Sequence, residues 1–194
     1  TWHAVAEAAR NAKPEGRAAI ARAGAAAAVG LLLSPAGDTL PVTELRALTG
    51  DELPGDVAAL IAIARGDTSD ARRNLANSDP KPGPVYRWGL GGWVGTPRLL
   101  TAYAHFELGD YMLTLNLLSD YTPDYLQPNA LDPRWAAIGW ARLVRGLADE
   151  RLGRKVDAER EFRSVLAQWK DADPSVVPLV LQARAGLGRV TGEG

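Results

Sequence analysis

Few residues of this chain have the types and spacing that chemistry requires. There is no cysteine, which excludes disulfides, thiolate nucleophiles and cysteine-ligated metal centres. The two histidines, His3 and His105, are far apart in the sequence, and neither has a second histidine at metal-binding spacing. The segment GLGG at 89–92 lacks the lysine and the glycine spacing of a phosphate-binding loop. We therefore expect no catalytic residue, no metal, no cofactor and no enzyme activity.

Asp171 and Asp173, in the segment DADP, come closest to a pair of catalytic carboxylates. An aspartate directly before Pro174 is also a common helix start, because its side chain caps free N–H groups and proline fits the first turn. We favour the capping interpretation. His105 is expected on the inner side of a helix, either as a packing or solvated residue or as a pH-sensitive binding contact.

Composition sets the broad class of protein. The chain has 194 residues, of which 46% are hydrophobic and 23% charged, as is typical of a soluble globular domain. The net charge of −1, with both signs mixed along the sequence, provides no basic face for nucleic acid. The uncharged stretch AGAAAAVGLLLSPAG is 15 residues long, shorter than the roughly 20 that a membrane helix needs. We expect a buried helix there and no transmembrane segment.

The segment RLGRKVDAEREF at 151–162 contains the pattern that organises the fold. A small residue precedes its glycine by seven positions, and an alanine and a phenylalanine follow by five and nine. Small residues let two helices cross closely, a glycine allows a tight turn, and a large apolar residue fills the space beside the crossing. The same offsets recur, more weakly in the last set, as Gly146, Gly153, Ala158 and Phe162; Ala102, Gly109, Thr114 and Leu118; Ala59, Gly66, Ala71 and Leu75; and Ala9, Gly16, Ala21 and Ala25.

This repeat predicts helix–turn–helix units at about 1–33, 54–78, 97–121 and 133–170, within one domain that covers 1–194. The pairs Thr96-Pro97, Asp132-Pro133 and Asp173-Pro174 mark helix starts. A last helix at 175–190 is expected to cap the array. No segment alternates with the two-residue period of a strand, so the expected fold class is all-α. The expected helices are 2–12, 15–32, 54–65, 68–77, 97–108, 110–120, 133–152, 154–170 and 175–190, with a short helical turn at 43–49.

The turn segments ARGD at 64–67 and ELGDY at 107–111, together with the pairs Ala71–Leu75 and Ala158–Phe162, resemble the tetratricopeptide-repeat (TPR) family. The segment at 145–174 is also similar to the helical-repeat regions of bacterial serine/threonine kinases and of stand-alone bacterial repeat proteins. The resemblance implies a right-handed α-solenoid whose first helices line a concave surface. It also implies a role in protein–protein interaction.

On that concave surface the resemblance places Leu99, Tyr103, Phe106 and Glu107 from one unit, and Trp140, Leu143, Leu147 and Glu150 from the next. Tyr103, Phe106 and Trp140 are large enough to anchor a peptide. The two glutamates would favour a basic partner. The alternative is that these side chains pack between the first helices of neighbouring units.

The connection at 78–96 is longer than helix packing requires, and loops of this length are often functional. It contains Tyr86, Arg87, Trp88 and Trp93, which belong to the residue types that dominate protein interfaces. These residues either contact a partner, or the tryptophans fold back and cover an exposed face between units.

We therefore expect a non-catalytic scaffold or accessory subunit that binds other proteins, without nucleic acid, in a larger bacterial complex that could be membrane-bound. Thr1 in place of an initiator methionine indicates a processed product or part of a longer chain. That favours the extracytoplasmic side after leader removal, and otherwise the cytoplasm. The alternative function is a ligand- or peptide-sensing regulatory domain of a longer signalling protein such as a kinase.

Overall fold

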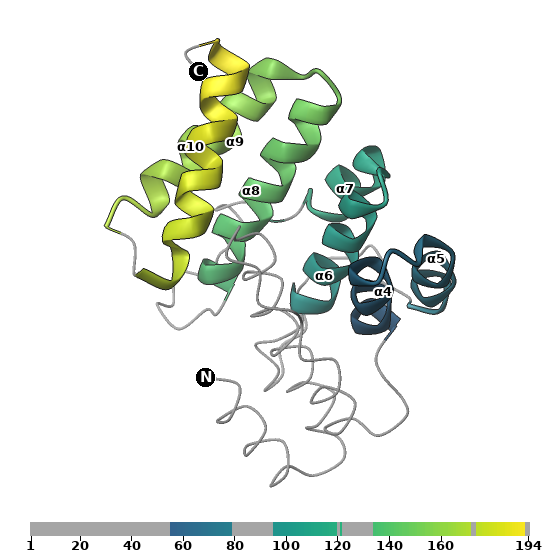
Figure 1. Ribbon diagram of the computed structural model, residues 1–194. Coiled ribbons are helices and arrows are strands. Elements are labelled where there is room, and N and C mark those ends of the chain that lie inside the picture. The colour runs from purple at the N-terminus through teal and green to yellow at the C-terminus, as the bar shows by residue number, and fades with distance from the viewer. Residues whose placement is uncertain (1–54, 79–94, 120, 122–133, 172–173, 193–194) are drawn as a thin grey trace, which may run out of the picture. The chain divides into compact units, whose positions relative to one another are not determined.

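The computed structural model describes residues 55–78, 95–119, 121, 134–171 and 174–192 (Figure 1). Within these ranges the chain forms helices and turns and contains no strand, which confirms the expected all-α class. The chain divides into two compact units, 1–81 and 82–194, and the division falls inside the long connection expected at 78–96. The helices expected at 2–12 and 15–32 and the helical turn at 43–49 lie outside the described residues.

The described part of the first unit is a helical hairpin of α4 (Gly55–Ala64) and α5 (Thr68–Asn77). Its bounds agree with the expected helices at 54–65 and 68–77. Ala59 and Ala71 are fully buried, as expected for the two small residues of a close crossing. At the open end of the hairpin, a Cβ added to Gly55 would lie 2.7 Å from the Asn74 carbonyl oxygen. The two backbones therefore stay close along the length of α4.

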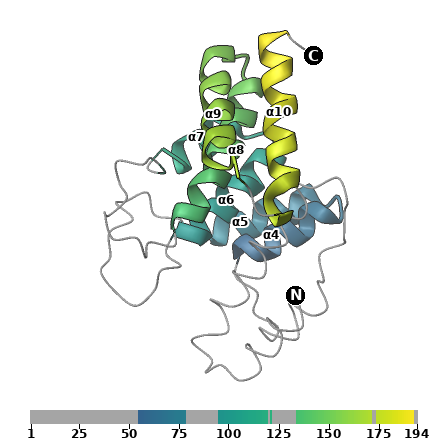
Figure 2. The ribbon, with the colours of Figure 1, turned by 90° about the vertical axis from the view of Figure 1, so that its left-hand side faces the viewer.

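The second unit contains α6 (Gly95–Glu107), α7 (Tyr111–Leu117), α8 (Arg134–Arg151), α9 (Lys155–Gln168), a short 3₁₀ helix η2 (Pro174–Val176) and α10 (Val177–Thr191). Helix α7 packs against α6 and α8, and α9 packs against α8 and α10. Helix α6 also touches α8, and α8 touches α10. Figures 1 and 2 show α8, α9 and α10 side by side from two directions. Within this unit, each α-helix thus contacts the α-helices next to it in the chain.

Two of the expected helix starts are wrong in detail. Helix α6 begins at Gly95, so Thr96-Pro97 lies within its first turn, where a proline is tolerated because the first N–H groups have no helical acceptor. Pro174 begins η2, and α10 starts at Val177 with no side-chain cap. Pro178 occupies the first turn of α10, which suits a residue without an N–H group. Asp132 and Asp173 lie outside the described residues.

Three turns with the same geometry join the paired helices. Gly66, Gly109 and Gly153 have φ values of 77°, 83° and 73°, in the left-handed region that favours glycine. In each turn the residue after the glycine donates its N–H to the carbonyl five residues earlier, at 2.9, 2.9 and 2.8 Å. This Schellman closure satisfies carbonyls at the end of the first helix. The expectation that these glycines form the turns is confirmed.

Phe162 fills the space where three helices meet. It is fully buried, and its ring lies against Gly146 of α8 and Gly186 of α10. A Cβ added to Gly146 would lie 2.8 Å from Phe162 Cε1, and one added to Gly186 would lie 2.7 Å from Cε2. Both glycines are therefore required for the ring to fit. The expected role of Phe162 beside a close helix crossing is confirmed. The contact with Gly186 was not expected from the sequence.

The α8–α9 hairpin repeats the same device at its other end. The ring of Trp169 lies against Gly139, where an added Cβ would be 2.6 Å from Trp169 Cε2. Gly139 precedes Gly146 by seven residues, and Trp169 follows Phe162 by seven. That spacing is the one that an antiparallel hairpin requires, because both pairs then face each other in one register.

Thr114 lies in α7 at the position where the α4–α5 hairpin has Ala71 and the α8–α9 hairpin has Ala158. It is fully buried, and its hydroxyl lies 3.2 Å from the carbonyl oxygens of both Ala102 and Asp110. The hydroxyl can therefore donate across the crossing to α6 or back along its own helix. A polar side chain is tolerated at this buried position because it has an acceptor.

Helix α10 packs against the α8–α9 hairpin. Its buried residues are Leu179, Ala183 and Gly186. Val177 and Leu181, four residues apart on the same side of α10, are 41% and 55% exposed. Terminal caps of repeat arrays usually present a polar outer face. Helix α10 therefore covers α8 and α9, and its exposed residues include Val177 and Leu181 as well as Arg184 and Arg189.

Candidate functional site

The residues expected to bind a partner fall into two groups. Tyr86, Arg87, Trp88 and Trp93 lie outside the described residues. Tyr103, Phe106 and Glu107 lie in the last two turns of α6, and Trp140 lies in α8. All four of these described residues belong to the second unit.

Tyr103 is buried, with 4% of its surface exposed, and its hydroxyl forms a hydrogen bond with the carboxylate of Glu107 one helical turn later. Burial is the main cause that raises the pKa of the Tyr103 hydroxyl above its ordinary value, followed by the charge of Glu107 and the hydrogen bond to it. The hydroxyl therefore stays protonated and donates to Glu107. Tyr103 is therefore a buried hydrogen-bond partner of Glu107 and does not itself present an accessible face.

Two ring contacts link Tyr103, the hydrogen-bond partner of Glu107, to Phe106 and Tyr111. The ring of Phe106 stacks on Tyr103, with centroids 6.2 Å apart and an interplanar angle of 20°. Phe106 also meets Tyr111, the first residue of α7, at 5.6 Å and 55°. We call Tyr103, Phe106 and Tyr111 the aromatic cluster. Phe106 and Tyr111 are half-buried, and Glu107 is exposed.

Tyr111 was missing from the residues expected at this site. The turn at Gly109 returns the chain so tightly that the first residue of α7 comes back against the last turn of α6. The segment ELGDY contained this information, because its glycine fixes the turn and its tyrosine follows two residues later. The contact between Tyr111 and Phe106 could be recognised only once the geometry of the turn was known.

Glu150, the second glutamate expected on the surface, is used within the fold. Arg189 of α10 donates from Nε to Oε1 at 2.6 Å and from Nη2 to Oε2 at 2.9 Å. This two-pronged pair joins α8 to α10. In contrast, no arginine or lysine of the described residues lies within ion-pair distance of Glu107. A preference for basic partners thus depends on Glu107.

The remaining residues expected on this surface differ in exposure. Leu99, Leu143 and Leu147 are buried, as in the packing alternative. Trp140 is half-buried and has no ring contact with the aromatic cluster among the described residues. His105 lies with Nδ1 3.1 Å from Asp110 Oδ2, across the same turn that brings Tyr111 back to α6.

A cluster of charged side chains lies where α8 meets α9. It contains buried carboxylates, as a reactive site would, but each of them is paired with an arginine. Asp149 is buried, and its pKa is raised by that burial and then by the charge of Asp157. Arg154 lies 3.8 Å from Asp149, and Arg145 lies 2.7 Å from Glu161. Each buried acid is thus paired with an arginine. Structural ion-pair networks shift pKa values in the same way, so the shift alone does not indicate catalysis.

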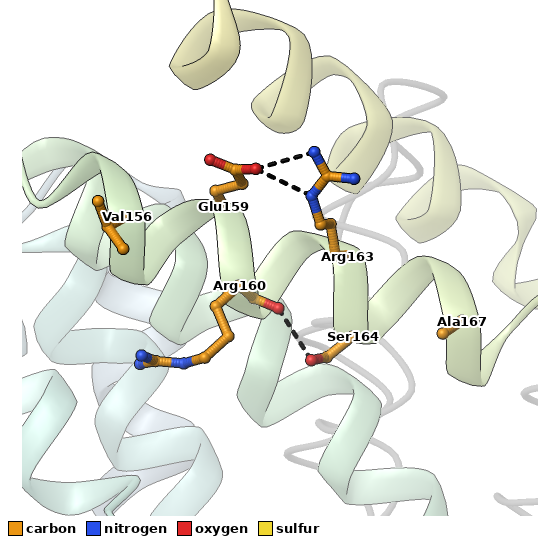
Figure 3. Close-up of a pocket in the computed structure, with 6 residues that line it drawn as sticks. All are labelled: Val156, Glu159, Arg160, Arg163, Ser164 and Ala167. Carbon is orange, nitrogen blue, oxygen red and sulfur yellow. Dashed lines mark hydrogen bonds and ion pairs between the residues drawn. The ribbon is translucent and has the colours of Figure 1, made fainter.

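A shallow hollow follows the outer face of α9 (Figure 3). Arg163 donates to Glu159 at 3.0 and 2.8 Å, and Arg160 pairs with Asp157 at 2.8 Å, so acids of the same helix neutralise its cations. Ser164 donates its hydroxyl to the Arg160 carbonyl at 2.8 Å. The described lining consists of Val156, Glu159, Arg160, Arg163, Ser164 and Ala167. This face has no unbalanced charge with which to select a ligand.

No family model matches the chain, and neither the curated proteins nor the solved structures compared with it give a match. In the described part of the chain no helix combines the length and apolar character needed to cross a membrane. The same residues contain no group of three or more histidine, cysteine, aspartate or glutamate side chains that could hold a metal ion. The aromatic cluster with Glu107 is therefore the candidate site with the most distinctive chemistry.

Proposed function

We propose that this chain is a right-handed α-solenoid of TPR-like units that binds another protein and performs no catalysis. Two observations support the solenoid. The three interhelical turns share one geometry, and each helix of the second unit contacts its nearest neighbours in the chain. Arrays of this kind expose an extended surface for partners.

The single observation that carries the binding role is the aromatic cluster together with Glu107, a carboxylate that has no arginine or lysine within ion-pair distance among the described residues. The half-buried ring of Phe106 stacks on Tyr103 and meets half-buried Tyr111 at a tilt, and Glu107 is an exposed charge with a hydrogen bond to Tyr103. Rigid aromatic side chains with one oriented charge are typical of residues that dominate binding energy. We propose that a partner protein contacts this surface, with Trp140 as a further contact on α8.

Photo-crosslinking tests the proposal in the organism that makes the protein. A benzophenone amino acid replaces Tyr111 in one variant and Val156 in a control, since Val156 is 78% exposed on the outer face of α9. We expect one defined protein to be crosslinked from position 111 and not from 156. Adding Phe106→Ala should abolish that product while circular dichroism shows an unchanged helix content. Crosslinks of equal yield from both positions would refute the proposed surface.

The expected membrane-bound complex can be addressed in the same experiment. Membrane and soluble fractions are separated before the crosslinked products are identified by mass spectrometry. Recovery of the position-111 product in the membrane fraction would support an accessory subunit of a membrane complex. A product formed within a longer form of the same chain would instead support the regulatory-domain alternative.

A further inference from the structure

We infer that Glu107, Phe106 and Tyr111 form a recognition site for an arginine side chain of the partner polypeptide. The inference rests on the proposed function and deepens it, because it specifies the chemistry that the partner must present. It depends on three features: the availability of the carboxylate, the aromatic surface beside it, and the fixed orientation of both.

The carboxylate of Glu107 differs from those of α8 and α9. The five acids of α8 and α9 each have an arginine within 4 Å, with nitrogen–oxygen distances from 2.6 to 3.8 Å. Glu107 has no such cation among the described residues, although it is exposed. An ionised carboxylate offers about four acceptor positions, and the Tyr103 hydroxyl takes one of them. Glu107 can therefore accept two further N–H groups from outside.

The rings next to Glu107 favour a planar cation. A guanidinium stacks on aromatic faces and is more weakly hydrated than an ammonium, so arginine loses less than lysine on entering a partly buried aromatic surface. Phe106 precedes Glu107 in α6, and its ring lies 5.6 Å from that of Tyr111 at an angle of 55°, with both rings partly exposed. A cation within about 6 Å of a ring centroid gains from the ring charge distribution.

The orientation is set before any ligand arrives. The Tyr103 hydroxyl gives the Glu107 carboxylate a hydrogen-bond partner, and the Phe106 ring is stacked on Tyr103. The turn at Gly109 fixes Tyr111 against Phe106. Little side-chain entropy is then lost on binding, which is the main advantage of a preorganised site. The fold makes the same kind of carboxylate–guanidinium pair internally between Glu150 and Arg189.

The test uses blocked tripeptides, acetyl-Gly-Arg-Gly-amide and acetyl-Gly-Lys-Gly-amide, titrated into the full chain labelled with ¹³C-phenylalanine. The chain has two phenylalanines, so the spectrum reports Phe106 in the site and the fully buried Phe162 as an internal control. We expect the arginine peptide to shift the Phe106 ring signals saturably and to leave those of Phe162 in place. The lysine peptide should bind at least about threefold more weakly, because a point charge cannot stack or pair in two-pronged fashion.

Two variants with the same change in net charge separate the site from general electrostatics. Glu107→Gln keeps an acceptor for Tyr103 but loses the charge, and it should raise the dissociation constant of the arginine peptide at least about fivefold. Glu159→Gln removes an exposed carboxylate of α9 and should leave the constant unchanged. Equal weakening in both variants, equal binding of the two peptides, or no saturable shift of Phe106 would overturn the inference.

The two proposals can fail separately. If a partner is crosslinked from position 111 while the arginine peptide does not bind, the arginine site is wrong and the binding surface stands. If the peptide binds at Phe106 and Glu107 but no protein is crosslinked there, the arginine site stands and the scaffold function is wrong.

Discussion

Because the Phe162 ring contacts two glycines, we predict that Gly146→Ala destabilises the wild-type protein but stabilises a variant that lacks the ring. In the wild type, Gly146→Ala places a methyl group 2.8 Å from the Phe162 ring, and overpacking of this kind costs about 1–3 kcal/mol. The gain in helix propensity from glycine to alanine is about 1 kcal/mol, so the variant should be destabilised by about 0–2 kcal/mol. Phe162→Ala alone should cost about 3–5 kcal/mol, because it empties a fully buried aromatic position.

In the Phe162→Ala variant, an alanine at position 146 no longer clashes with the phenylalanine ring, but it still has a higher helix propensity than glycine. Gly146→Ala should then stabilise the protein by about 1 kcal/mol, which gives a coupling energy of about 1–3 kcal/mol between the two positions. Gly186→Ala should behave in the same way, since it meets the other side of the ring. The free energy of unfolding is measured by urea denaturation followed by circular dichroism, with the m-value as a check on two-state behaviour.

Additive effects would refute this reasoning. If Gly146→Ala changes stability by the same amount with and without the phenylalanine ring, the ring does not limit the space at that glycine. A cost below about 1 kcal/mol for Phe162→Ala would likewise show that the ring is not a buried plug. Phe162→Leu provides a milder background if the alanine variant does not fold.

Three further predictions concern polar groups of the second unit. The folded-state pKa of Asp149 is raised above its unfolded value, so the favourable contribution of this carboxyl is present at low pH and is lost as the pH rises through the folded pKa. Asp149→Asn should therefore raise the melting temperature more at about pH 7 than at about pH 4; a larger gain at low pH would contradict the sign of the shift. Thr114→Val removes a buried hydroxyl whose acceptors are the Ala102 and Asp110 carbonyls and should lower the free energy of unfolding by about 0.5–1.5 kcal/mol, whereas no loss in urea denaturation would mean that neither hydrogen bond contributes to stability. Arg189→Gln breaks a half-exposed ion pair with Glu150 and should cost about 1 kcal/mol or less in low salt, with a difference from the wild type that disappears in 1 M NaCl; a salt-independent loss would indicate packing by the arginine stem instead.

Local features of the sequence predicted local structure well. Gly66, Gly109 and Gly153 each require a backbone conformation that other residues rarely adopt, so their spacing marked the turns correctly. The bounds of α4, α5 and α9 follow from the same anchors to within two residues. Local geometry was sufficient here, because a turn is decided by the few residues within it.

Contacts between distant segments were harder to predict. Gly186 and Gly139 look like unfavourable residues inside helices, and only the packing of Phe162 and Trp169 against them shows why they are glycine. The burial of Tyr103 and the use of Glu150 by Arg189 depend on how α6, α8 and α10 lie together. Sequence periodicity selects the face of a helix, but not the neighbour that covers it.

The register of the α8–α9 hairpin limits how such a unit can change in length. A single inserted residue in either helix would rotate everything beyond it by about 100°, so that aromatic side chains would turn away from the bare backbone opposite them. Adding seven residues to both helices together would keep every facing pair and extend the hairpin by about two helical turns. Growth in matched heptads is therefore the permitted path, and it gives a means to lengthen this unit in the laboratory without redesigning its core.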